Sequence, residues 1–176
     1  MVISINLTSI LHTYKLGQLV AQEVLLKPGL TTLLLRGDLG SGKTTFVRGL
    51  VAALPGGEEA EVASPSFNLV NIYPTRPEVV HMDLYRLRGS EAGELFEEYA
   101  EAAPPDGTGP GRILAVEWAE HLPDACRADD HLTLSWRREG TGRTVAIETG
   151  DEIGAALVSA LAEFFGESGG SPDRAD

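Results

Sequence analysis

The sequence has little cysteine, and it contains no long hydrophobic run. Cys126 is the single cysteine among 176 residues, so neither an intrachain disulfide nor a cysteine-based zinc cluster can form. No stretch approaches the roughly 20 apolar residues that a membrane helix needs. No basic leader with an apolar core opens the sequence. These absences predict a protein of a reducing, cytoplasmic compartment that makes no membrane contact.

Positive charge is also scarce. The 14 lysines and arginines face 26 aspartates and glutamates, which gives a formal net charge of −12, and only three of the cations are lysines. A protein that binds nucleic acid by itself needs a basic surface that displaces counterions from the phosphates. The charge balance therefore argues against autonomous binding to RNA, DNA or an anionic membrane, and it favours a protein as the large partner.

The length and the hydrophobic pattern predict one domain at residues 1–165, followed by a disordered tail at 166–176. Strands are expected at 2–7, 30–36, 67–73, 78–82, 112–116, 131–137 and 143–149, and helices at 9–27, 43–54, 90–102 and 151–165. A loop rich in glycine and proline is expected at 104–111. Because strands and helices alternate early and the last two strands pair locally, we expect a central, mainly parallel sheet with antiparallel added strands.

A phosphate-binding loop is the strongest motif. Residues 37–44 fit G-x-x-x-x-G-K-[ST] at every fixed position and lie between an expected strand and an expected helix. Its glycines let backbone N–H groups wrap a phosphate closely, Lys43 is suited to neutralise the β- and γ-phosphates, and the Thr44 hydroxyl is suited to ligate Mg²⁺. The fold expected is therefore α/β, a P-loop NTPase-like three-layer sandwich. The nucleotide-binding residues predicted here are Asp38, Leu39, Gly40, Ser41, Gly42, Lys43, Thr44 and Thr45.

Two acidic residues are candidates for the metal side of this site. Asp83 and Glu117 each end an apolar strand, the position at which a P-loop protein places its second acid. We assign Glu117 to the metal, and Asp83 to the attacking water or to a metal-bound water. His81 is interpreted as a core residue, and Trp118 as packing.

The nucleotide and the reaction class leave alternatives open. Guanine-specific P-loop proteins usually read the base with N-K-x-D, and no lysine here is followed two positions later by aspartate, which favours ATP. A small-molecule kinase, or a nucleotide-gated binding module without turnover, remains an alternative to an ATPase. The arginines that a kinase could use to clamp its acceptor are Arg86, Arg88, Arg137 and Arg138.

Several separate segments resemble one known family. They are Gly37-Asp38-Leu39-Gly40-Ser41-Gly42-Lys43-Thr44-Thr45-Phe46 with Arg48-Gly49, Ser64-Pro65-Ser66-Phe67, His81-Met82-Asp83-Leu84-Tyr85-Arg86-Leu87, and Val116-Glu117-Trp118. In order and spacing they resemble the TsaE family, the small bacterial ATPases of tRNA threonylcarbamoyladenosine biosynthesis. Ser66 stands where that family more often has threonine.

The resemblance implies an ATPase that is weak alone and stimulated in a complex, with ATP or ADP and Mg²⁺ as ligands. Its implied partners are a threonylcarbamoyl transferase subunit (TsaD-like) and its paralogous scaffold (TsaB-like), which modify the adenosine next to the anticodon of tRNAs reading ANN codons. The ATPase cycle would reset the complex, and tRNA would be reached only through it. The resemblance makes Asp83, Glu117 and Lys43 the catalytic residues, with Thr44 and Glu117 as the magnesium pair. It further implies that Trp118, Thr13 and Arg143 lie beside the nucleotide.

Overall fold

The computed structural model describes residues 2–26, 32–100, 111–126, 131–140, 142–149, 159 and 161–165. Most of the expected loop at 104–111, most of the expected helix at 151–165 and the expected tail at 166–176 lie outside these residues. The domain boundary at residue 165 and the disordered tail therefore stay predictions.

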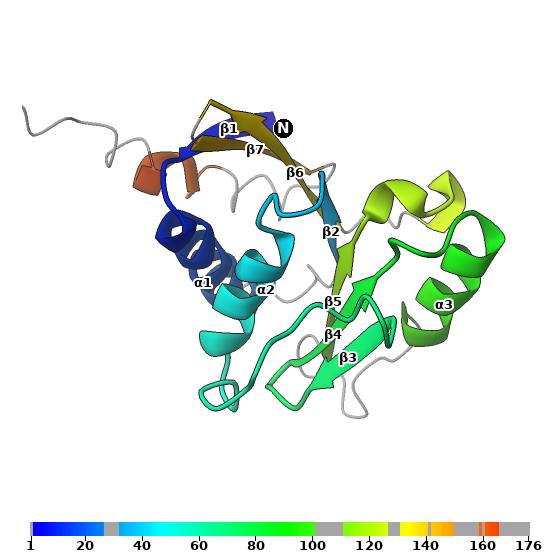
Figure 1. Cartoon of the computed structure of the whole chain (residues 1–176). Helices are drawn as coiled ribbons and strands as arrows, with labels where there is room; N and C mark the ends of the chain where they lie inside the picture. Colours follow the sequence, from blue (N-terminus) through cyan, green and yellow to red (C-terminus); the bar gives the residue numbers. More distant parts are fainter. Residues whose placement is uncertain are drawn as a thin grey trace, which may run out of the picture.

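The elements follow one another largely as the sequence pattern predicts (Figure 1). In chain order they are β1 (Val2–Leu7), α1 (Ile10–Leu26), β2 (Thr32–Arg36), α2 (Lys43–Ala52), β3 (Val70–Tyr73), β4 (Glu78–Asp83), α3 (Ser90–Ala100), β5 (Arg112–Glu117), the short 3₁₀ helices η1 (Ala119–His121) and η2 (Asp124–Cys126), β6 (His131–Glu139) and β7 (Gly142–Thr149). Residues 159 and 161–165 are helical as well.

The described strands form one seven-stranded sheet in the order β1-β7-β6-β2-β5-β4-β3. The four central strands, β6, β2, β5 and β4, are mutually parallel. Antiparallel pairs complete both edges, with β7 and β1 on one side and β3 on the other. The expected parallel centre with antiparallel additions is confirmed. Because the central strands run in the same direction, their carboxyl ends lie side by side along one end of the sheet.

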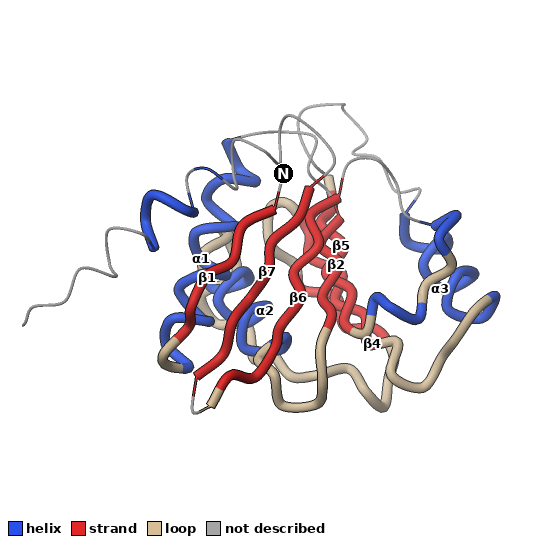
Figure 2. The backbone as a smooth tube through the Cα atoms, turned by 90° about the horizontal axis from the view of Figure 1, so that it is seen from above, coloured by secondary structure: helices blue, strands red, loops and turns tan. Residues whose placement is uncertain are grey.

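Helices cover both faces of this sheet and make three layers (Figures 1 and 2). Along β2, Leu33 and Leu35 belong to the core beneath α1 and α2, whereas Leu34 belongs to the core beneath α3. This alternation follows from the two-residue period of a strand. A strand with apolar side chains on both faces is fully buried, which is why β2 is a continuous leucine run.

Helices α1 and α2 approach each other closely because a glycine stands on each side of their crossing. A Cβ atom added at Gly17 would lie 2.1 Å from the Phe46 carbonyl oxygen, and one at Gly49 would lie 2.0 Å from the Tyr14 carbonyl oxygen. Neither position has room for a side chain. The crossing holds α2, and with it the loop that precedes this helix, firmly against the rest of the domain.

Strand β3 begins later than the expected start at Phe67. The Leu69 N–H donates to the Pro65 carbonyl at 2.6 Å, and Leu69 has a φ of 66°, so the chain turns before it enters the sheet at Val70. The apolar Phe67 that suggested a strand is 90% exposed. The segment before β3 is therefore irregular and lies along the edge of the site described below.

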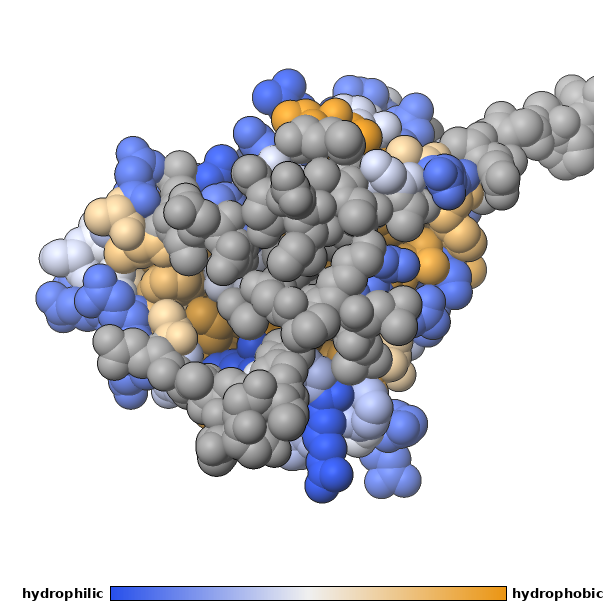
Figure 3. All heavy atoms as spheres, turned by 180° about the vertical axis from the view of Figure 1, so that it is seen from behind, coloured by the Kyte–Doolittle hydropathy of each residue, from blue (hydrophilic) through white to orange (hydrophobic). Residues whose placement is uncertain are grey.

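Among the described residues, no helix is both long enough and apolar enough to cross a membrane. Figure 3 shows apolar side chains in separate groups on one face, with hydrophilic side chains around the rim.

Candidate functional site

The loop between β2 and α2 is built around glycines with positive φ. Gly37, Gly40 and Gly42 have φ values of 131°, 73° and 124°, a region that residues with a Cβ atom rarely adopt. Gly42 also caps α2, and among the described residues no side chain forms a capping hydrogen bond at that helix start. The first N–H groups of α2 are therefore free of a side-chain acceptor, which leaves them available to an anion.

Lys43 begins α2 and reaches back over the loop. Its Nζ donates to the Gly37 carbonyl and to the Asp38 carbonyl, the latter at 3.1 Å, and lies 4.3 Å from the centre of the Trp118 ring. Burial lowers the pKa of Lys43, and the carboxylates of Glu117, Glu120, Asp83 and Asp38 oppose that shift. The site therefore holds a poorly hydrated ammonium group beside the place predicted for phosphates.

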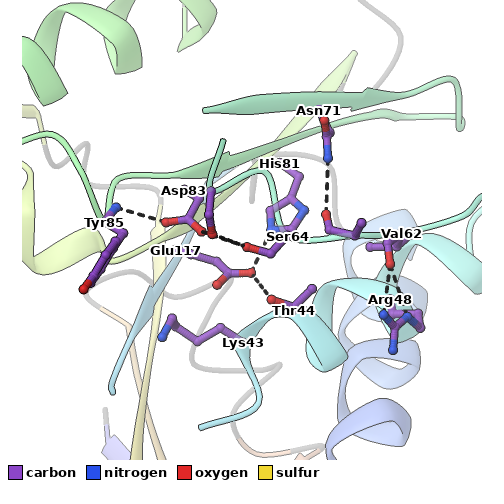
Figure 4. A network of polar contacts seen from close by, with 12 residues as sticks. Lys43, Thr44, Arg48, Val62, Ser64, Asn71, His81, Asp83, Tyr85 and Glu117 are labelled. Carbon is purple, nitrogen blue, oxygen red and sulfur yellow. Dashed lines mark hydrogen bonds and ion pairs between the residues drawn. The ribbon is translucent and has the colours of Figure 1, made fainter. Parts of the chain in front are cut away.

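Glu117 ends β5 next to the loop, because β5 pairs directly with β2 and Glu117 is opposite Leu35. The Thr44 hydroxyl donates to Glu117 Oε1 at 2.7 Å, and His81 Nε2 lies 2.9 Å from the same oxygen (Figure 4). The residue is only 4% exposed. The two oxygens predicted to serve magnesium thus lie within one hydrogen bond of each other.

Asp83 ends the neighbouring strand β4, in register with Glu117. Its Oδ2 accepts hydrogen bonds from the hydroxyls of Ser64, at 2.8 Å, and Ser66, while its Oδ1 accepts the Tyr85 N–H at 3.0 Å. Asp83 is 2% exposed. Both carboxylate oxygens are therefore engaged by the protein in this conformation.

The segment Ser64–Ser66, called the serine segment below, is held in place by the residues that precede it and by β3. Arg48, on α2, donates through Nη2 to the Val62 carbonyl at 3.0 Å, and the Asn71 amide donates to the Ala63 carbonyl at 3.2 Å (Figure 4). These contacts anchor the chain immediately before Ser64. They connect helix α2, which carries Lys43 and Thr44, to the serines that reach Asp83.

A pocket of about 320 Å³ opens over the loop. Its lining contains Ile10, Thr13, Leu39, Gly40, Ser41, Gly42, Lys43, Thr44, Thr45, Ser64, Ser66, Asp83, Glu117, Trp118 and Arg143. This volume is within the range of small-molecule sites. Residues from six separate regions of the sequence therefore converge on one cavity.

The structure brings together almost all the residues predicted for the site. Asp38 is the exception, since it is absent from the lining and contributes its carbonyl to Lys43 and to the Ser41 N–H. Arg143, which lies on β7, donates through Nη2 to the Gly40 carbonyl oxygen at 3.3 Å. The individual roles assigned to these residues stay predictions.

Three lining residues had no predicted role in the pocket. Ile10 lies at the start of α1, and Ser64 and Ser66 flank a proline in an irregular segment. Two hydroxyls on either side of Pro65 were a signal in the sequence, but nothing in the pattern linked them to Asp83. The four arginines considered as kinase clamps do not line the pocket.

The chemistry of the donors fits a phosphate with a magnesium ion. Thr13 Oγ1 and Ser41 Oγ are buried beside the loop without a hydrogen-bond partner among the described residues. Hydroxyl and carboxylate oxygens are the ligands that Mg²⁺ prefers, and this ion is usually held by one or two carboxylates together with substrate phosphates. The Thr44 hydroxyl and the Glu117 carboxylate are such oxygens, and they lie one hydrogen bond apart. In the described part of the chain, no group of three or more His, Cys, Asp or Glu residues could hold a metal.

Comparison with known proteins identifies the family. The model of the family described as "Threonylcarbamoyl adenosine biosynthesis protein TsaE" matches residues 7–145. This chain belongs to the TsaE family. The resemblance carried by the motifs is confirmed, and the family takes part in threonylcarbamoyladenosine biosynthesis.

Individual relatives agree with this assignment. The tRNA threonylcarbamoyladenosine biosynthesis protein TsaE of Aquifex aeolicus is 43% identical over 109 residues, which cover 61% of this chain and 70% of that protein. The protein of the same name from Synechocystis is 42% identical over 108 residues, 61% of this chain and 64% of its own length.

A solved structure supports the fold. The crystal structure of YdiB from Bacillus subtilis matches with a TM-score of 0.65 at 26% sequence identity, covering 93% of this chain and 96% of that one. The expected P-loop NTPase-like α/β fold is thus confirmed for this member of the TsaE family.

Proposed function

We propose that this chain binds ATP with magnesium in the pocket over residues 37–44, and hydrolyses the β–γ bond within the assembly that forms N6-threonylcarbamoyladenosine in tRNA. The hydrogen bond between the Thr44 hydroxyl and Glu117 Oε1, 2.7 Å long, is the observation that carries the proposal. It joins the start of the phosphate-loop helix to an acid at the end of the adjacent strand, which is the arrangement P-loop ATPases use.

The loop residues would bind and orient the triphosphate. The uncapped N–H groups at the start of α2 would donate to phosphate oxygens, and the Lys43 ammonium would leave the Gly37 and Asp38 carbonyls to pair with them. Thr44 and Glu117 would hold the magnesium ion, which neutralises charge on the β- and γ-phosphates. Trp118, Thr13 and Arg143 would border the rest of the nucleotide.

Asp83 would orient the attacking water or accept a proton from it. Its two oxygens accept from Tyr85 N–H, Ser64 and Ser66 in this conformation, so the carboxylate has little capacity left for a water. We therefore propose that hydrolysis by the isolated chain is slow. Partners that change the conformation of the serine segment would accelerate it.

The proposed partners are a TsaD-like threonylcarbamoyl transferase subunit and a TsaB-like scaffold, in the cytoplasm. The net charge of −12 supports a subunit that reaches tRNA only through them, because a strongly acidic surface repels phosphates. Hydrolysis would reset the complex between rounds of modification.

The test is ATP hydrolysis by this protein alone and with both partners, with Lys43→Ala and Glu117→Ala as controls. The proposal expects slow turnover that the partners stimulate and that both variants lose. ATP binding without hydrolysis in the full assembly would leave a nucleotide-gated module. Transfer of the γ-phosphate to an added metabolite would instead identify a kinase.

A further inference from the structure

His81 is a fully buried polar residue to which the proposed function assigns no task. It lies in β4 with 0% of its surface exposed. Its strand neighbours Val79, Val80 and Met82 are buried and apolar. An apolar side chain would serve packing at least as well, because a buried imidazole costs free energy unless it is hydrogen-bonded.

The contact that compensates for this burial is made to the metal-side acid. His81 Nε2 lies 2.9 Å from Glu117 Oε1, and the side chains are 0% and 5% exposed. A carboxylate oxygen can only accept, so Nε2 carries a hydrogen and donates it. The Thr44 hydroxyl donates to the same oxygen at 2.7 Å, so two donors from α2 and β4 hold Oε1 between them.

The other imidazole nitrogen, Nδ1, indicates that His81 makes its polar contact through Nε2 alone. Nδ1 is buried and has no hydrogen-bond partner among the described residues. The centre of the Tyr73 ring lies 6.3 Å from the centre of the His81 ring. A buried N–H without an acceptor is costly, so the form with hydrogen on Nε2 alone fits the surroundings. The hydrogen bond to Glu117 is then the polar interaction that the structure shows for this imidazole.

Both donors end on Oε1, and the second carboxylate oxygen points away from them (Figure 4). Glutamate has more rotatable bonds than aspartate, so an unrestrained Glu117 would sample several positions at the end of β5. We infer that His81 is a positioning residue: it holds Oε1 against Thr44 and keeps the second oxygen of Glu117 directed to the magnesium side of the pocket. This inference rests on the proposed function, and residues behind metal ligands commonly act in this way.

The experiment measures binding of the non-hydrolysable ATP analogue AMP-PNP by calorimetry, once with Mg²⁺ and once with EDTA. The ratio of the two dissociation constants isolates the contribution of the metal side. Three variants are compared with the wild type. His81→Phe keeps a ring without a donor, His81→Asn has an amide too short to reach Oε1, and His81→Gln can place an amide N–H near the Nε2 position.

Val80→Ala is the matched structural control, because Val80 lies next to His81 in β4 but faces the opposite core. It should lower the melting temperature and leave the Mg²⁺ ratio unchanged. We call the dissociation constant in EDTA divided by that in Mg²⁺ the Mg²⁺ ratio, and we expect it to fall about tenfold or more in His81→Phe and His81→Asn. The affinity in EDTA should stay unchanged in both variants. His81→Gln should recover most of the wild-type ratio. If His81→Phe does not fold, His81→Asn and His81→Gln still give the comparison.

A wild-type Mg²⁺ ratio in His81→Phe or His81→Asn would overturn the inference. So would an equal loss of affinity with Mg²⁺ and with EDTA, which indicates a purely structural role, or a His81→Gln variant no better than His81→Asn. Wild-type protein that does not bind AMP-PNP, or binds it without any Mg²⁺ dependence, would instead overturn the proposed function.

Discussion

Asp83 and Glu117 are two buried carboxylates in register at the ends of adjacent strands, yet their surroundings differ in kind. Glu117 is held by Thr44 and His81, which belong to a helix and a strand. Asp83 is held by Ser64 and Ser66, which belong to an irregular segment, and by the backbone of the turn that follows it.

The difference bears on what each acid can do. Groups on regular elements keep their geometry at little cost, which suits a metal ligand that must be in place before the nucleotide arrives. Hydroxyls on an irregular segment can be withdrawn when that segment rearranges, and this would free Asp83 for a water molecule. We therefore expect Glu117 to act mainly in binding and Asp83 mainly in turnover.

The largest effect is expected for Glu117→Gln. The substitution keeps the size of the side chain but removes the charge that magnesium requires, and its amide group competes as a donor with Thr44 and His81. Affinity for Mg²⁺ and AMP-PNP together should fall about 100-fold or more, while affinity in EDTA stays close to wild type. Calorimetry checks this, and an unchanged Mg²⁺ ratio would remove Glu117 from the metal side.

For Asp83→Ala we expect a loss of the same order, but in hydrolysis alone. Nucleotide binding should stay within a few-fold of wild type, whereas partner-stimulated hydrolysis should fall by about 100-fold or more, as for loss of a general base. Steady-state phosphate release and AMP-PNP calorimetry together check the split. Normal hydrolysis by Asp83→Ala within the full complex would show that the assignment of this residue is wrong.

The serines should show a clear effect on stability. The double variant Ser64→Ala with Ser66→Ala removes both hydroxyl donors to Asp83 Oδ2, and a hydrogen bond to a charged group contributes about 1.5–3 kcal/mol of net stability when it is shielded from water. Because water can reach these serines, we expect a total loss of about 1–3 kcal/mol. Urea unfolding measures it, and a loss below this range would mean that the serines do not restrain Asp83.

The smallest effect is expected for Ser66→Thr, the residue more common in the family that the motifs resemble. The hydroxyl is kept and one methyl group is added at a half-buried position. The free energy of unfolding should stay within about 0.5 kcal/mol of wild type, well short of the alanine double variant. A larger loss, measured by the same urea titration, would show that the segment has no room for the methyl group.

Much of the fold could be predicted from the sequence because its signals are local. The phosphate loop, the apolar run of β2 before it and the hairpin of β6 and β7 each depend on residues within a few positions of one another. The predicted start of β3 was wrong because the residues around Phe67 have the composition of a strand, whereas the hydrogen bond from the Leu69 N–H to the Pro65 carbonyl turns the chain there. The hydrophobic periodicity of the sequence does not reveal a single hydrogen bond of this kind.

The candidate site was predictable in part. Asp83 and Glu117 were found because acids that end apolar strands are recognisable in sequence. The contacts of Ser64 and Ser66 with Asp83, and of His81 with Glu117, were missed because they join residues 17 to 36 positions apart. No local pattern specifies such pairs, and a histidine within an apolar strand can equally well be interpreted as a residue of the hydrophobic core.

By itself, the sequence determined that a glycine-rich loop with the P-loop pattern lies between a buried strand and a helix, since glycines at fixed spacing and the Lys43-Thr44 pair specify that local geometry. Only the tertiary structure decided which side chains meet there. The strand order puts β5 between β2 and β4, and the two-residue strand period turns His81, Asp83 and Glu117 to the face that carries α2. Strand order is set by non-local packing of the whole core, and that information is spread over the chain rather than written in any motif.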